Sequence, residues 1–219
     1  METDPALGDL GLSDDDDETA QGVLNKLQVA WINEKFSPEL LPYQGDLVDC
    51  MLEQVKHMEE NVKKVPKNDI RGALHGLELS RIRYIINNYL RTRLDKIELY
   101  AYSILDQESK RPQNELYLSE GEFQFAKDYF TNMQTAFQTL AIRHFPRNLV
   151  TFEPSKMTVA PALHSYVFIK AFKDISGLIL PGDNSEGRDE EVDLDAGSRH
   201  IIQYQPVAHL IKDGAVQLI

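Results

Sequence analysis

Four runs of apolar residues at helical spacing occupy the first two thirds of this 219-residue chain. Apolar side chains three and four positions apart lie on one face of a helix, so each run predicts an amphipathic helix. The helices are expected to begin near Thr19, Asp46, Asp69 and Ser119, and at the last of these Glu122 completes a capping box. Prolines end three of the runs: Pro38 and Pro42, Pro66, and Pro146. The pattern predicts an N-terminal bundle of amphipathic helices over residues 20–145.

The sequence changes character at Pro146. Residues 146–164 contain three prolines without a clear period and are expected to form a linker. Short runs rich in β-branched and aromatic residues then predict strands: SYVFIKAF, GLILP, EEVDL, HIIQYQ and AVQLI. A short helix is expected from Pro206 to Lys212, with Gly214 ending it. The fold class is therefore mainly α, with the helical bundle domain followed by a small β-rich (α+β) domain over residues 165–219.

The net charge of −12 comes from two local segments. Residues 1–22 hold eight acidic residues and no lysine or arginine, and residues 183–195 hold seven acidic residues and one arginine. No apolar run approaches the roughly 20 residues of a membrane-spanning helix, so no membrane contact is expected. The acidic start does not resemble a signal peptide, and Cys50 has no second cysteine to pair with. These features predict a reducing compartment, the cytosol or the nucleus.

Residues 1–19 are expected to be a disordered acidic tail, because they combine high charge with few apolar residues. Two hypotheses remain open for this tail. It is either fully solvated, or it is a short peptide that docks on a partner groove through Leu7, Leu10 and Leu12.

Residues with catalytic or metal-binding potential are dispersed along the chain. The six histidines do not show metal-ligand spacing with a cysteine or a carboxylate. The chain also lacks a phosphate-binding P-loop, a dinucleotide-binding glycine motif and a nucleophile elbow. We therefore expect no enzyme activity, no cofactor and no metal site.

A basic run, SRIRYIINNYLRTRLDKIE (80–98), interrupts this acidic chain, and residues 63–96 hold nine basic residues against three acidic ones. A DNA-binding helix would gather its basic side chains on one face. At 100° per residue, Arg81, Arg83 and Arg91 are instead spread around the helix axis. Direct nucleic-acid binding through these three arginines is kept as the alternative to a structural or interface role.

Arg93 falls inside the apolar face of the same predicted helix, together with Tyr89 and Ile97. A guanidinium among apolar side chains is costly unless it is paired. Either an acidic residue elsewhere in the chain pairs with Arg93, or Arg93 anchors a contact with another polypeptide. Three apolar residues at the end of the chain would also be exposed unless another surface covers them: Val216, Leu218 and Ile219. All six residues are predicted to form a partner interface, and the chain is expected to be one subunit of an obligate complex.

An ordered set of segments resembles the Sld-five subunit family of the eukaryotic GINS complex. The segments are AWINEKFSPELL (30–41), LEQVKHMEENV (52–62), SRIRYIINNYLRTRLDKIE (80–98), LSEGEFQFAKDYF (118–130) and GSRHIIQYQPVAHLIKDGAVQLI (197–219). The resemblance extends from about Leu24 to the last residue, whereas the N-terminal tail and residues 182–191 match the family poorly.

The resemblance implies a function in DNA replication. GINS is a heterotetramer of this subunit with three Psf sister subunits, and each subunit pairs a helical domain with a small β-rich domain that docks on its sisters. GINS joins the minichromosome-maintenance ring and the Cdc-forty-five protein in the CMG replicative helicase, whose ATPase lies in the ring. The chain is thus expected to be a non-catalytic scaffold needed for initiation and fork progression.

The resemblance also implies a nuclear location, with chromatin association during S phase and only indirect or weak contact with DNA. In fungi the equivalent tail docks on a trimeric replisome hub, which makes such a hub a candidate partner of residues 1–19. The three leucines of the tail differ from the fungal docking motif.

Overall fold

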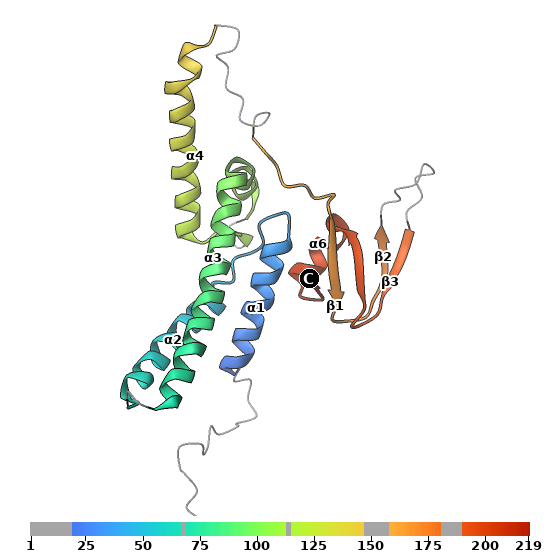
Figure 1. Cartoon of the computed structure of the whole chain (residues 1–219). Helices are drawn as coiled ribbons and strands as arrows, with labels where there is room; N and C mark the ends of the chain where they lie inside the picture. The colour runs from blue at the N-terminus through green and yellow to red at the C-terminus, as the bar shows by residue number, and fades with distance from the viewer. Residues whose placement is uncertain (1–18, 67–68, 113–114, 147–157, 181–189) are drawn as a thin grey trace, which may run out of the picture.

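The computed structural model describes residues 19–66, 69–112, 115–146, 158–180 and 190–219 (Figure 1). Its helical part consists of α1 (Ala20–Phe36), α2 (Gly45–Lys64), α3 (Ile70–Lys110), α4 (Glu120–Leu140) and the 3-10 helix η3 (Ile142–His144). The second part consists of β1 (Tyr166–Ala171), β2 (Ile175–Leu180), β3 (Glu190–Leu194), β4 (Arg199–Gln203), α6 (Tyr204–Lys212) and β5 (Val216–Leu218). The predicted fold class, mainly α with a small β-rich domain after the helices, is confirmed.

Local signals in the sequence define several helix ends. Thr19 caps α1 by accepting a hydrogen bond from the N–H of Gly22. At α4, Ser119 accepts from the N–H of Glu122, and the Glu122 carboxylate accepts from the N–H of Ser119. This reciprocal pair confirms the predicted capping box. Gly214, with a φ of 68°, follows α6, where a left-handed residue ends the helix at no steric cost.

Helix α3 is the element that joins two hydrophobic clusters of the helical domain. Its N-terminal half packs with α1 and α2 around Leu27 and Met51. Its C-terminal half packs with α4 around Ile97 and Ala126. Helices α2 and α4 thus lie along different halves of one 41-residue helix (Figure 1). Within this helix, Tyr100 departs from helical geometry, with a φ of −116° and a ψ of 23°.

The small domain contains a three-stranded antiparallel sheet in the order β4–β1–β5 and a separate two-stranded sheet of β2 and β3. Residues alternate between the two faces of a strand, and on β1 one face is buried: Val167, Ile169 and Ala171. Helix α6 contributes Val207 and Ile211 to the same core.

The small domain docks directly on the helical domain of its own chain. The N–H of Leu218 donates a hydrogen bond to Oδ1 of Asn33 on α1, at 2.8 Å. Leu41, in the segment between α1 and α2, is part of the hydrophobic cluster of the small domain. A domain of about 55 residues is marginal alone, so this docking supplies apolar burial that its own core lacks.

Candidate functional site

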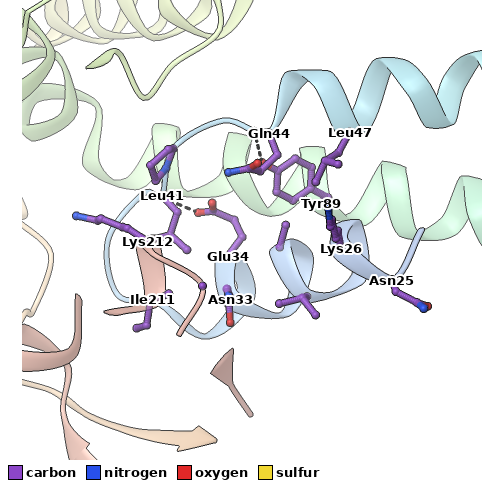
Figure 2. Close-up of a pocket in the computed structure, with 14 residues that line it drawn as sticks. Asn25, Lys26, Asn33, Glu34, Leu41, Gln44, Leu47, Tyr89, Ile211 and Lys212 are labelled. Carbon is purple, nitrogen blue, oxygen red and sulfur yellow. Dashed lines mark hydrogen bonds between the residues drawn. The ribbon is translucent and has the colours of Figure 1, made fainter. Parts of the chain in front are cut away.

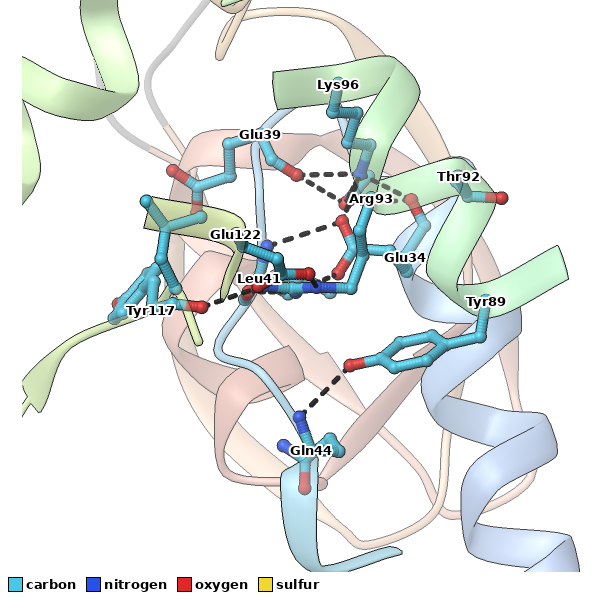
Figure 3. A network of polar contacts seen from close by, with 12 residues as sticks. Glu34, Glu39, Leu41, Gln44, Tyr89, Thr92, Arg93, Lys96, Tyr117 and Glu122 are labelled. Carbon is cyan, nitrogen blue, oxygen red and sulfur yellow. Dashed lines mark hydrogen bonds and ion pairs between the residues drawn. The ribbon is translucent and has the colours of Figure 1, made fainter. Parts of the chain in front are cut away.

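Arg93 lies at the centre of a buried polar network between α1, α3 and the start of α4 (Figure 3). Its side chain is 0% exposed. Nε and one terminal nitrogen donate to the two carboxylate oxygens of Glu122, at 2.7 and 3.0 Å. The remaining hydrogen bonds reach a carboxylate oxygen of Glu34 at 3.1 Å and the carbonyl oxygens of Leu41 and Tyr117 at 2.7 and 2.8 Å. A guanidinium has five N–H donors, so these five bonds satisfy the group fully.

Lys96, one turn further along α3, extends the network. Its ammonium donates to a carboxylate oxygen of Glu34 at 2.8 Å, and also to the carbonyl oxygen of Glu34. It reaches the hydroxyl of Ser37 at 2.7 Å and the carbonyl oxygen of Glu39 at 2.8 Å. The Glu34 carboxylate therefore bridges two cations, and the Glu122 carboxylate gives the buried network two negative charges against two positive ones.

The pKa shifts follow from this geometry. Burial acts against the charged form of Arg93, but the hydrogen-bonded Glu122 and the charge of Glu34 outweigh it and raise its pKa. For Lys96 burial dominates and lowers the pKa, although Glu34 partly offsets it. Burial raises the pKa of the neighbouring Tyr89 hydroxyl to about 12. Arg93 is therefore a permanent charge, whereas the charge of Lys96 depends on its pairing with Glu34.

Glu39 connects the network to the small domain. Its backbone carbonyl accepts from Lys96, while its carboxylate accepts from the hydroxyl of Tyr204 at 2.9 Å and pairs with Lys212 at 3.0 Å. Burial, followed by the charge of Glu39, raises the pKa of Tyr204. For Lys212 burial acts against the charged form, but the neighbouring Glu39 and Tyr117 together raise its pKa. The segment between α1 and α2 thus holds helix α3 on one side and helix α6 on the other.

The network is suited to holding α1, α3, the start of α4 and the small domain in fixed positions relative to one another. Within the described ranges, every buried side-chain nitrogen and oxygen has a hydrogen-bond partner. The same residues contain no cluster of three or more histidine, cysteine, aspartate or glutamate side chains that could hold a metal ion. None of the helices in the described ranges combines the length and the apolarity needed to cross a membrane.

A cleft of about 460 Å³ lies beside the network, between α1, the start of α2 and the end of α6 (Figure 2). Polar side chains from three elements line it, among them Asn33, Gln44 and Lys212. Inside the cleft the N–H of Gln44 donates to the hydroxyl of Tyr89 at 3.1 Å. Because both domains contribute walls, the shape of this cleft depends on the docking of the small domain.

A second depression, which we call the α3–α4 groove, is almost entirely apolar and has a volume of about 520 Å³. Its walls come from the C-terminal half of α3, from α4, from η3 and from residues 158–159. Leu99 and Phe137, two of the lining residues, are 58% and 53% exposed. Exposed apolar surface of this kind marks sites of protein contact.

The structure corrects most of the predicted partner interface. Five of its six residues are buried inside this chain, each at most 1% exposed: Tyr89, Arg93, Ile97, Val216 and Leu218. They cannot touch another polypeptide directly, because α1, α4 and the rest of the small domain already cover them. For Arg93 the intrachain alternative is the correct one. Ile219 is 47% exposed and remains a predicted contact residue.

For the other predicted site residues, the structure does not decide the role. Arg81, Arg83 and Arg91 are exposed on α3, and Arg83 pairs with Glu59 of α2. Nucleic-acid contact through these arginines remains a prediction. The tail leucines, at positions 7, 10 and 12, lie outside the described residues.

Sequence reasoning missed Glu34, Lys96 and Glu39 as members of the network. A signal for Glu34 was present, because it follows Leu27 by seven residues and so lies on the apolar face of α1. An acidic residue at such a position predicts a buried cation as its partner. No pattern marks Glu39, which lies in an irregular segment.

Comparisons with known proteins identify the family. A family model described as the GINS complex protein helical bundle domain matches residues 50–141, and one described as the DNA replication complex GINS protein SLD5 C-terminus matches residues 161–219. The chain is 40% identical to the DNA replication complex GINS protein SLD5 of Xenopus laevis, with 100% of both chains covered. It is 41% identical to the protein of that name from Rattus norvegicus and 38% identical to that from Homo sapiens, in each case over 92% of this chain and 91% of the relative. The chain therefore belongs to the SLD5 family of GINS complex proteins.

Proposed function

We propose that the chain is a non-catalytic structural subunit of the GINS heterotetramer in DNA replication. Its partners would be three Psf sister subunits and, within the CMG helicase, the minichromosome-maintenance ring and the Cdc-forty-five protein. The proposal places the subunit in the nucleus, on chromatin during S phase, where it supports initiation and fork progression. Family membership supports this role, and so does a polar network whose groups are satisfied within the chain.

The α3–α4 groove is the observation that carries the scaffold role. The three buried clusters of the described residues do not include Leu99 or Phe137, and the groove keeps these apolar side chains open to solvent. A second exposed apolar row follows the first turns of α3, with Ile70, Leu74 and Leu77 at 73%, 56% and 69% exposure. Apolar surface on two parts of one long helix is what a subunit needs when sister helices pack against it.

The proposed organisation has four parts. Residues 1–19 form the tail, residues 20–145 the helical domain, residues 146–164 the linker, and residues 165–219 the small domain. The Glu39 contacts hold the two domains in one orientation, so that surfaces on both are presented together.

Co-expression with the three Psf subunits tests the proposal. We expect poor solubility of the chain alone and a stable 1:1:1:1 complex on size-exclusion chromatography. Phe137→Asp introduces a charge into the groove and is expected to lower recovery of the sisters at least tenfold. Gln138→Asp, at the adjacent exposed position, is the matched control and should behave as the unmodified chain. A well-behaved monomer that ignores the sister subunits would contradict the proposal.

A direct nucleic-acid-binding module is the second candidate. It is favoured only by the exposure of Arg81 and Arg91 on a helix whose surroundings are basic. The acidic Glu59 engages the third arginine of the set, Arg83, and so reduces the positive charge available to phosphates.

A further inference from the structure

The outer face of the three-stranded sheet is open and apolar. Opposite residues of paired antiparallel strands lie on the same face, and Phe168 of β1 is opposite Ile201 of β4. On the other side of β1, the N–H of Ile219 donates to the carbonyl oxygen of Phe168 at 3.0 Å. Together with Tyr166 these side chains form a continuous row, which we call the outer patch. Their exposed fractions are 58% for Tyr166, 61% for Phe168, 60% for Ile201 and 47% for Ile219.

The outer patch is not needed for the core of the small domain. The opposite face of the same strands carries Val167, Ile169 and Ile202, and each is at most 8% exposed. Leaving large apolar side chains such as those of Phe168 and Ile201 in water gains nothing for folding, so an exposed patch of this kind indicates a binding partner.

Positive charge borders the outer patch. Lys170 of β1 is opposite Arg199 of β4, two pairs further along the ladder than Phe168 and Ile201 and therefore on the same face of the sheet. On its other side Lys170 is opposite Gln217 of β5. The strand positions of this face include no acidic residue. An occupant that combines apolar side chains with carboxylates therefore fits both parts of the surface.

A polyanion such as DNA fits the small domain less well. Residues 158–219 hold nine acidic residues against five lysines and arginines, so the domain favours negative groups only locally, beside Lys170 and Arg199, and not along an extended phosphate backbone. The two cations beside the outer patch suit an acidic peptide better than a nucleic-acid strand.

The N-terminal tail of the same chain has the required composition. Residues 1–18 hold eight acidic residues and three leucines, Leu7, Leu10 and Leu12. Its reach is sufficient: from Ala20 to Asn33, which bonds β5, helix α1 rises by about 20 Å at 1.5 Å per residue. Twelve residues of extended chain between Thr19 and Leu7 span about 40 Å. Tethering also raises the local concentration of the tail to roughly the millimolar range.

We propose that the N-terminal tail docks on the outer patch of its own small domain. The leucines cover Phe168 and Ile201, and the acidic residues lie near Lys170 and Arg199.

Methyl nuclear magnetic resonance on the assembled tetramer tests this proposal. Cys50, the single cysteine, is replaced by serine, and Ser13→Cys in the tail carries a spin label. We expect the methyl signals of Ile201 and Ile219 to lose at least half of their intensity relative to the reduced label. Unchanged signals overturn the proposal. Attenuation at Ile142 instead would place the tail in the α3–α4 groove and would overturn it equally.

Two matched variants separate docking from mere tethering. Lys170→Glu with Arg199→Glu reverses the charge beside the patch, and replacement of the three tail leucines by serine removes the apolar anchors. Each variant is expected to restore at least half of the lost signal at Ile219, and 0.5 M salt should weaken the attenuation because it screens exposed charges. If the attenuation persists in both variants, the tail is near the sheet only because it is tethered, and the proposal fails.

Discussion

The Glu34→Gln substitution removes one charge from the buried network while keeping the size of the side chain. Glu34 is 1% exposed, and its carboxylate accepts from Arg93 at 3.1 Å and from Lys96 at 2.8 Å. The substitution leaves two buried cations with a single carboxylate, that of Glu122. Removing one partner of a buried ion pair costs about 3–5 kcal/mol, because the remaining charge stays buried without compensation.

The proton affinity of Lys96 limits this cost. Burial already lowers its pKa, so without Glu34 the ammonium can release its proton and become neutral. At pH 7 that release costs about 1.36 kcal/mol for each of the roughly 3.4 pH units below the ordinary lysine pKa, or about 4.6 kcal/mol. Whether Lys96 stays charged or releases its proton, the free energy of unfolding is expected to fall by about 3–5 kcal/mol.

Amide hydrogen exchange of α3, measured by mass spectrometry in the assembled complex, reports this loss as faster local opening. At 1.4 kcal/mol per tenfold, exchange should accelerate by roughly two to three and a half orders of magnitude. Glu59→Gln is the matched control, since it removes the partner of Arg83, whose side chain is 51% exposed. Surface pairs contribute about 1 kcal/mol or less, so the control should change exchange less than tenfold.

Two outcomes decide whether the reasoning holds. If Glu34→Gln accelerates exchange no more than Glu59→Gln, the network does not stabilise the junction and the reasoning is refuted. Adding Lys96→Met to Glu34→Gln removes the unpaired cation and leaves Arg93 balanced by Glu122. This double variant is expected to recover at least tenfold of the lost protection, which measures the coupling between the two sites.

Two further predictions concern Tyr89 and the exposed arginines. The pKa of Tyr89 is raised to about 12, so its stabilising contribution is complete below pH 10 and is lost between pH 10 and 12, by up to about 2.7 kcal/mol. A pH series of urea midpoints should show a shallower alkaline decline for Tyr89→Phe, and equal declines would contradict the assignment. If residues 63–96 bind DNA, the DNA affinity of the isolated chain should fall steeply with salt, and the double substitution Arg81→Ala with Arg91→Ala should weaken it. Fluorescence anisotropy measures both effects, and no DNA binding at low salt excludes that function.

Local features of the sequence were sufficient to predict most elements of the fold. Apolar spacing, prolines and the Ser119 capping box predicted the four long helices, because these signals act within a few residues of one another. The short strands and the helix ended by Gly214 were predicted for the same reason. The division of α3 between two clusters was not predicted, since a single apolar period does not show which helix packs on which half.

The network was predicted only in part. The position of Arg93 in an apolar face requires a buried partner, and this requirement follows from the cost of an unpaired charge. Its partners lie 59 and 29 residues away, in Glu34 and Glu122, and no local pattern connects such distant positions. Pairing over these separations is decided only when the helices pack.

The sequence by itself determined that certain faces must be covered, because burial of apolar side chains drives folding wherever they occur. It did not determine which polypeptide covers them. Val216 and Leu218 were predicted to meet a partner, yet β5 pairs with β1 of the same chain and contacts α1. Only the tertiary structure showed this, since the hydrophobic effect has no direction and does not distinguish an intrachain surface from a partner surface. Among the described residues, the apolar surfaces that remain exposed after folding include the α3–α4 groove, the first turns of α3 and the outer patch of the sheet.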